Sequence, residues 1–139
     1  MIILDTNIVS AMMRTVPDRM VTAWLDDQDA ASIWTTAVTI FEIELGIALL
    51  AKGRKRRQLE GDFARVLRDD LQDRVLPFDL ASAQAAAALA ADRERTGRSV
   101  DVRDTQIAGI AIARRATIAT RNARHFSDLP VPLINPWMT

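Results

Sequence analysis

Met1-Ile2-Ile3-Leu4-Asp5-Thr6-Asn7 is the stretch from which the fold of this chain is inferred. A short apolar run that ends in a carboxylate and two small polar residues is typical of a buried parallel strand followed by a turn and a helix. Asp5 would then lie at the carboxyl end of the first strand, which is the edge where open α/β sheets bind ligands. The alternative is that Asp5, Thr6 or Asn7 only caps the next helix.

The rest of the chain repeats this alternation of short apolar strands and amphipathic helices. Strands are predicted at residues 2–5, 32–36, 74–77, 117–120 and 132–134. Helices are predicted at residues 8–13, 18–27, 38–51, 54–71, 79–96 and 102–115, and the helix at 38–51 is apolar almost all round, so we expect it to be deeply buried. Strands that alternate with helices predict an α/β fold with about five parallel strands and helical crossovers, in a single domain spanning 1–139.

The composition excludes several classes of protein. The chain of 139 residues contains no cysteine, which excludes disulfides, zinc–thiolate sites and thiol catalysis. No apolar run reaches the roughly 18 residues that span a bilayer, and no signal peptide is recognisable. We therefore expect a soluble cytoplasmic domain that does not enter a membrane.

The charges cancel, since 18 basic and 18 acidic residues are present, so a general basic surface for nucleic acid is absent. They are clustered, however, and residues 52–57 carry five positive charges in six positions. Arg54, Lys55, Arg56 and Arg57 are therefore candidates for phosphate contacts with a nucleic acid. The alternative is that this run forms a solvated helix face.

Four polar residues from separate segments are expected to converge on one rim of the sheet. Asp5 ends the first strand, and Glu42 lies about one turn into the helix after the second. Asp104 opens a helix of about 13 residues, or ~20 Å, which must run antiparallel to the strand it feeds, so its start lies back at the carboxyl edge. Asn122 follows that strand directly. The convergence of all four favours a functional site.

Each of these residues also has a structural alternative. Glu42 could be a partly buried glutamate paired with an arginine, and helical periodicity does not choose between it and Glu44. Asp104 stands three residues after Asp101, so it could be the acid of a capping box. Asn122 could be a turn residue.

Carboxylates packed together repel and raise one another's pKa unless a cation lies among them. Oxygen ligands without histidine or cysteine suit Mg²⁺ or Mn²⁺. Such an ion binds phosphate oxygens, lowers the pKa of a water molecule and stabilises charge in the transition state. The sequence therefore predicts a metal site at Asp5, Glu42 and Asp104 that hydrolyses a phosphodiester.

The sequence also resembles a known family, the PIN-domain ribonucleases, and most of all the VapC/FitB toxins of bacterial toxin–antitoxin pairs. The likeness covers essentially the whole chain. It is carried by four motifs in order, which are Ile2-Ile3-Leu4-Asp5-Thr6-Asn7, Thr39-Ile40-Phe41-Glu42-Ile43-Glu44-Leu45-Gly46-Ile47, Asp104-Thr105-Gln106-Ile107-Ala108-Gly109-Ile110-Ala111 and Ala119-Thr120-Arg121-Asn122-Ala123-Arg124-His125-Phe126.

This resemblance implies a three-layer α/β/α domain that acts as a Mg²⁺-dependent endoribonuclease, forms a homodimer and is inhibited by a small DNA-binding antitoxin. Asp5, Glu42 and Asp104 match the acidic metal site of the family. The fourth position is often Asp in the family and is Asn122 here, which keeps an oxygen ligand but loses a charge and weakens the case for a second metal. Thr6 and Thr120 match polar residues that orient ligands or the attacking water.

Two rival functions are a phosphotransfer domain and a non-catalytic partner that regulates DNA through an antitoxin. Receiver-type domains need a lysine late in the chain, whereas Lys52 and Lys55 are the only lysines here. Asn7 stands where a dehalogenase-like Asp-x-Asp pattern needs its second aspartate. We expect His125, the only histidine, to have a packing or surface role, and Trp137 to lie in the core or an interface.

Overall fold

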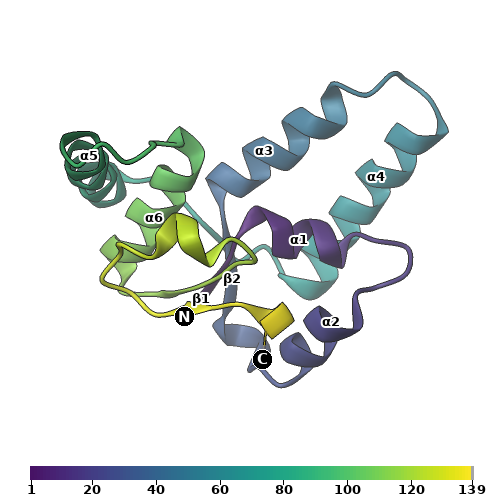
Figure 1. Cartoon of the computed structure of the whole chain (residues 1–139). Helices are drawn as coiled ribbons and strands as arrows, with labels where there is room; N and C mark the ends of the chain where they lie inside the picture. Colours follow the sequence, from purple (N-terminus) through teal and green to yellow (C-terminus); the bar gives the residue numbers. More distant parts are fainter. Residues whose placement is uncertain (139) are drawn as a thin grey trace.

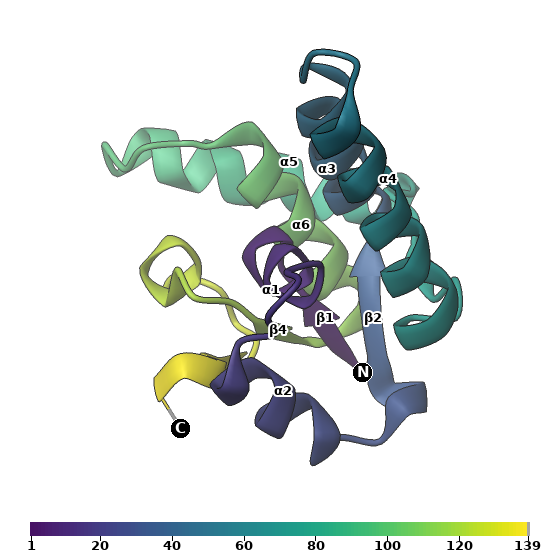
Figure 2. The same cartoon turned by 90° about the vertical axis from the view of Figure 1, so that its right-hand side faces the viewer.

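Five short strands form one parallel sheet in the computed structural model, which describes residues 1–138 (Figures 1 and 2). The order across the sheet is β3-β2-β1-β4-β5. The strands are β1 (Ile2–Leu4), β2 (Ile33–Thr36), β3 (Val75–Leu76), β4 (Thr117–Ala119) and β5 (Leu133–Ile134). The predicted α/β class, the number of strands and their parallel direction are confirmed.

The first strand lies at the centre of the sheet, between β2 and β4. Its successive side chains point to opposite faces, and both Ile3 and Leu4 are completely buried. Ile3 belongs to an apolar cluster with Ile107 and Phe126 on one face, and Leu4 belongs to a second cluster with Ile8 on the other. A strand covered on both faces must be apolar at consecutive positions, which accounts for the opening run of the sequence.

One face of the sheet is covered mainly by the first four helices, whose apolar side chains surround Leu4. A π-helical segment (Val66–Asp70) continues the fourth helix, and a short 3-10 helix (Ala30–Ser32) precedes β2. The helices are α1 (Thr6–Met12), α2 (Arg19–Asp26), α3 (Ala37–Ala48) and α4 (Arg54–Arg65). The predicted deep burial of α3 is wrong on one side, since Phe41 is 56% exposed.

The opposite face is covered by α5 (Leu80–Arg95) and α6 (Val102–Arg114), which pack closely against each other. Gly109 of α6 makes this approach possible, because a Cβ atom there would lie only 2.5 Å from the carbonyl oxygen of Ser82 and 2.6 Å from the Cβ of Ala86. The helices therefore form two layers around the sheet, as the three-layer prediction requires.

The chain ends with two 3-10 helices, Ala123–Phe126 after β4 and Pro136–Met138 after β5. The second of them packs against α2, so the C-terminal segment lies beside the first half of the chain (Figure 2). None of the helices between residues 1 and 138 combines the length and apolar character that crossing a bilayer requires.

Candidate functional site

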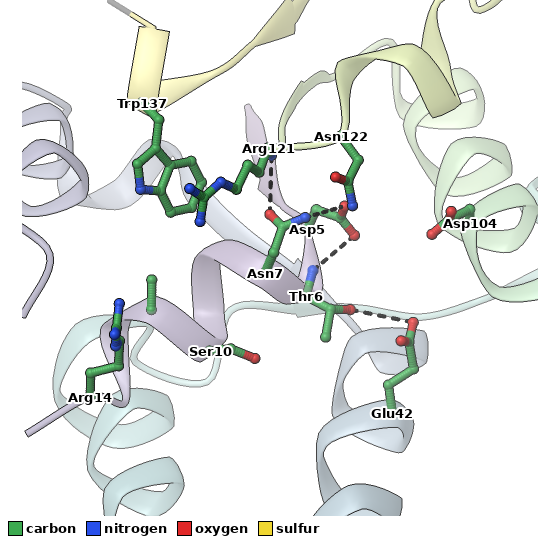
Figure 3. A pocket seen from close by; sticks show the side chains of 11 residues that line it. Asp5, Thr6, Asn7, Ser10, Arg14, Glu42, Asp104, Arg121, Asn122 and Trp137 are labelled. Atoms are coloured by element: carbon green, nitrogen blue, oxygen red, sulfur yellow. Dashed lines mark hydrogen bonds between the residues drawn. The ribbon is translucent and has the colours of Figure 1, made fainter.

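The four polar residues that were predicted to converge line one open pocket of about 590 Å³ at the carboxyl edge of the sheet (Figure 3). Asp5 follows β1, Glu42 lies on α3, Asp104 lies on α6 and Asn122 follows β4. The predicted convergence is therefore confirmed. The catalytic and metal-binding roles of these residues stay predictions.

Asp5 is the most deeply buried of the three carboxylates. It is 4% exposed and accepts hydrogen bonds from the backbone N–H of Thr6 to Oδ1 and from the hydroxyl of Thr120 to Oδ2, both at 2.8 Å. Burial raises the pKa of Asp5 above its ordinary value of 3.8, and these hydrogen bonds oppose that rise. Asp5 also caps α1, so the same carboxylate both caps this helix and lines the pocket.

Glu42 lies opposite Asp5 across the pocket. The hydroxyl of Thr6 donates to its Oε1 at 3.3 Å, and Arg103 Nη1 lies 4.0 Å from its Oε2. Burial and the charge of Asp5 raise the pKa of Glu42 above its ordinary value. Glu44 lies outside this pocket and lines a separate groove against α4. The structure thus distinguishes the two glutamates that helical periodicity left equivalent.

Asp104 occupies the position of the acid in a capping box, but the partner of its carboxylate is His125 and not the backbone at the helix start. The capping residue is Asp101, whose Oδ1 accepts the backbone N–H of Asp104 at 2.9 Å. The carboxylate of Asp104 is instead 3.0 Å from Nδ1 of His125. His125 has an exposed side chain, as expected of a surface residue, but its contact with Asp104 was not predicted.

Asn122 presents its side chain to the pocket beside Asp5 (Figure 3). Its backbone N–H donates to the Thr120 hydroxyl at 3.0 Å, whereas its side chain makes no hydrogen bond with the described residues. The amide is therefore free to bind a ligand, and the turn at this position does not depend on it.

The donor set fits a hard divalent cation, because every candidate ligand in the pocket is an oxygen atom. The negative charge of Asp104 raises the pKa of both Asp5 and Glu42, so the three carboxylates repel one another. The side chains are not gathered into a ready-made ligand cluster, since residues 1–138 contain no group of three or more acidic, histidine or cysteine side chains placed to hold a metal. The case for a metal ion at this site therefore rests on its oxygen ligands and on the repulsion between its carboxylates.

A cationic side of the pocket was not predicted from the sequence. Arg121 and Trp137 both line it, and the guanidinium carbon of Arg121 lies 4.7 Å from the centre of the Trp137 ring (Figure 3). Trp137 was expected in the core or an interface, and it is half-buried and packs against the apolar cluster that contains Leu4. Because Arg121 directly precedes Asn122, its place at the pocket could have been inferred from the sequence. Nothing in the sequence indicated that Trp137 also lines the pocket.

The basic run that was predicted to bind RNA does not line the pocket. Arg54, Lys55, Arg56 and Arg57 form the first turn of α4, next to the connection with α3, which projects from the domain (Figures 1 and 2). Arg56 is occupied locally, since its Nε pairs with Glu60 at 3.0 Å and its Nη1 donates to the carbonyls of Ala48 and Leu50. Contact between this run and RNA stays a prediction.

Comparison with known proteins gives a consistent result. The family model of the PIN domain matches residues 2–132. The chain is 34% identical to the VapC ribonuclease Y4jK of Sinorhizobium fredii over 99% of its own length and 98% of that protein. It is also 34% identical to the toxin FitB of Neisseria gonorrhoeae, over 99% of both chains. Among solved structures, a chain of FitAB bound to the IR36 DNA fragment superposes with a TM-score of 0.88 at 33% identity, covering 100% of this chain and 97% of the other.

Proposed function

The chain belongs to the PIN-domain family, among the VapC/FitB-type toxins of toxin–antitoxin pairs, and from this premise we propose that it is a Mg²⁺-dependent endoribonuclease that hydrolyses RNA phosphodiester bonds. The observation that carries the proposal is the meeting of Asp5, Glu42 and Asp104 in one pocket. These residues come from three separate elements and offer only oxygen atoms as ligands. Mn²⁺ prefers the same ligands and should replace Mg²⁺.

The three carboxylates would hold the metal ion, and Asn122 would add an oxygen without a charge. A metal ion held there would supply a water of lowered pKa and would stabilise the negative charge that develops on the phosphate. The carboxylates remain ionised only at an electrostatic cost in the free protein, because burial and mutual repulsion raise the pKa of Asp5 and Glu42. A cation between them would remove that cost, and the site should therefore prefer the metal-bound state.

Thr6 and Thr120 act as positioning residues in this proposal. Thr6 contacts two carboxylates through different atoms, since its backbone N–H binds Asp5 and its hydroxyl binds Glu42. Thr120 binds the second oxygen of Asp5 through its hydroxyl. These bonds fix the orientation of the carboxylates before any ligand arrives, which limits the reorganisation needed at the reacting phosphate.

The proposal includes a small DNA-binding antitoxin and a second copy of the chain as partners. The antitoxin is supported by the likeness to the FitAB complex, which was solved on a DNA fragment. A homodimer would cover large apolar side chains that are exposed in the single chain. Their exposed fractions are 56% for Phe41 on α3, 74% for Leu80 on α5 and 65% for Val102 on α6. Light scattering of the purified chain would measure the oligomeric state directly.

A second candidate function is a catalytically weak partner that acts through an antitoxin on DNA. Two observations favour this function, namely that the fourth polar residue of the site is the uncharged Asn122 and that the chain is similar to a complex bound to DNA. This candidate predicts that the purified chain does not cleave RNA in any metal. The two functions are therefore separated by one assay.

The test is a cleavage assay with the purified chain on total RNA, with Mg²⁺, with Mn²⁺ and with EDTA. Cleavage should require the metal, and Glu42→Gln should abolish it. Glu44→Gln is the matched control, because Glu44 lies on the same helix but outside the pocket. Full cleavage by a metal-stripped sample would contradict the mechanism, and absence of cleavage in every metal would favour the second candidate.

A further inference from the structure

Arg121 and Trp137 form a stacked pair at the mouth of the acidic pocket, on the side opposite Glu42 (Figure 3). Hydrogen bonds hold both residues of the pair in place. The indole Nε1 of Trp137 donates to Asp18 Oδ2 at 2.9 Å, and its backbone N–H donates to Asn135 Oδ1 at 3.0 Å. The backbone N–H of Arg121 donates to Asn7 Oδ1 at 3.2 Å. The Arg121 side chain therefore extends from a braced backbone along Trp137, on the side of the pocket away from Glu42 and Asp104 (Figure 3).

The guanidinium of Arg121 makes no ion pair with any described residue, although the pocket that it lines contains three carboxylates. Arg14 also lines this pocket without an ion pair to the described residues, whereas Arg103 lies 4.0 Å from Glu42 and Nδ1 of His125 lies 3.0 Å from Asp104. Stacking on an aromatic ring holds a guanidinium in place and leaves its N–H groups available in the plane of the group. Arg121 thus offers unpaired N–H donors at the rim of the pocket, opposite its acidic side (Figure 3).

An unpaired arginine beside an acidic centre suits a ligand that carries negative charge. The substrate of the proposed reaction is a polyanion, which the carboxylates repel at every phosphate that the metal does not contact. A planar guanidinium binds two phosphate oxygens at once, and this geometry makes arginine a frequent phosphate ligand. Trp137 restricts the side chain beforehand, so less conformational entropy is lost on binding.

We propose that Arg121 binds a phosphate of the RNA strand next to the one that is cleaved, and that Trp137 is a positioning residue that holds Arg121 for this contact. This inference rests on the proposed function, and it names a substrate contact that the acidic residues do not provide. The proposed contact places the RNA strand across the mouth of the pocket, between the acidic residues and the C-terminal 3-10 helix that carries Trp137.

The test measures the affinity of a fluorescein-labelled single-stranded RNA oligonucleotide by anisotropy, in EDTA and over a series of salt concentrations. Arg121→Gln should weaken binding by about tenfold at low salt, as expected for a lost charged hydrogen bond. It should also reduce the slope of log Kd against log salt by about 0.7. Arg68→Gln is the matched control, because Arg68 is exposed, pairs only with its neighbour Asp69 and lies outside the pocket.

Variants of the tryptophan separate positioning from general stability. Trp137→Phe retains a ring for stacking and should bind RNA nearly as the parent does, whereas Trp137→Leu should weaken binding while keeping the parent salt slope. Melting temperatures of all variants are measured alongside. A salt slope unchanged by Arg121→Gln would overturn the phosphate contact, and parent-like affinity of Trp137→Leu would overturn the positioning role.

The outcome is independent of whether the protein cleaves RNA. A parent chain that does not bind the oligonucleotide would overturn the inference, while the metal-dependent cleavage assay would still decide the proposed function. Conversely, a chain that binds RNA through Arg121 but cleaves none would refute the nuclease and retain the contact.

Discussion

The hydroxyl of Thr120 donates a hydrogen bond of 2.8 Å to Oδ2 of Asp5, although the two residues are 115 positions apart in the chain. The bond joins the carboxyl ends of two adjacent strands, and the backbone N–H of Asp5 extends the ladder by donating to the carbonyl of Ala119 at 2.9 Å. The sheet therefore orients the central carboxylate of the pocket. Because the same sheet is the core of the domain, stability and site geometry are coupled at this pair.

The first prediction concerns Asp104. Asp104→Asn should abolish cleavage and leave the melting temperature of the metal-free protein unchanged or higher. The charge of Asp104 raises the pKa of Asp5 and Glu42, so its removal relieves repulsion. Cleavage assays and thermal denaturation in EDTA would measure the two effects.

Asp101→Ala is the control for that experiment, since Asp101 caps α6. It should lower the free energy of unfolding by about 1 kcal/mol, the usual value of a helix cap. If Asp104→Asn destabilised the protein as much as Asp101→Ala does, Asp104 would have a structural role instead.

The fold was predictable because it depends on local patterns. Apolar runs such as Ile2-Ile3-Leu4 indicate buried parallel strands, and helix boundaries follow from caps such as Asp79, whose side chain accepts the backbone N–H of Ser82. The crossover rule then places the strand ends at one edge. The exposed side of α3 was not predictable, because apolar residues are also found where a helix faces a partner.

The acidic side of the site was predictable for the same reason, since each carboxylate lies at a strand end or near a helix start. Its cationic side was not. Arg121 and Trp137 meet through a segment that follows the last strand, and the contact depends on how that segment folds back over the pocket. The pairing of His125 with Asp104 likewise depends on a turn that no periodicity describes.

The second prediction concerns the contact between α5 and α6. Gly109→Ala should reduce the free energy of unfolding by about 1 to 3 kcal/mol, because the new methyl group overlaps the Ser82 carbonyl and Ala86. Alanine favours helices over glycine by about 1 kcal/mol, so overpacking must exceed that gain. Gly61→Ala on α4 meets nothing within 4 Å and should stabilise the protein, and urea denaturation of both variants provides the comparison.

The third prediction concerns the buried cation Arg93, which is 3% exposed and donates to both carboxylate oxygens of Asp128 at 2.9 Å. Asp128→Asn should lower the free energy of unfolding at neutral pH by about 2 kcal/mol, less than for a fully buried pair because water reaches the carboxylate. Asp69→Asn, which removes the partner of the exposed Arg68, should change stability little.

The difference in stability between the parent and Asp128→Asn should decrease as the pH falls. The hydrogen bond from Arg93 lowers the pKa of Asp128 below the value of 3.8 that holds in the unfolded chain. The stabilisation is therefore complete above pH 3.8 and is lost as the pH falls through the folded pKa. Parent and Asp128→Asn should become equally stable in acid, and a stability gap that persists there would contradict the assignment.

The fourth prediction concerns the basic run at the start of α4. Replacing Arg54, Lys55 and Arg57 together with Gln should weaken RNA binding and reduce its salt slope by about 0.7 for each lost contact. Arg56 is left in place because it binds the carbonyls at the end of α3, so its loss would also change the structure. An unchanged slope would mean that these three residues form a solvated helix face.

The last prediction concerns Asn122, whose side chain faces the pocket without a hydrogen-bond partner among residues 1–138. If it contributes an oxygen ligand but no charge, Asn122→Asp should tighten Mn²⁺ binding measured by calorimetry and raise activity at low metal concentration. The gain is limited because a fourth carboxylate also repels the other three.

Asn122→Ala removes the oxygen as well and should weaken Mn²⁺ binding, while the turn should survive because the backbone N–H of residue 122 still donates to Thr120. Thermal denaturation in EDTA checks that last point, since a variant that lost the turn would also melt at a lower temperature. If both variants bound Mn²⁺ as the parent does, position 122 would have no part in the metal site. The ion would then be held by Asp5, Glu42 and Asp104 alone.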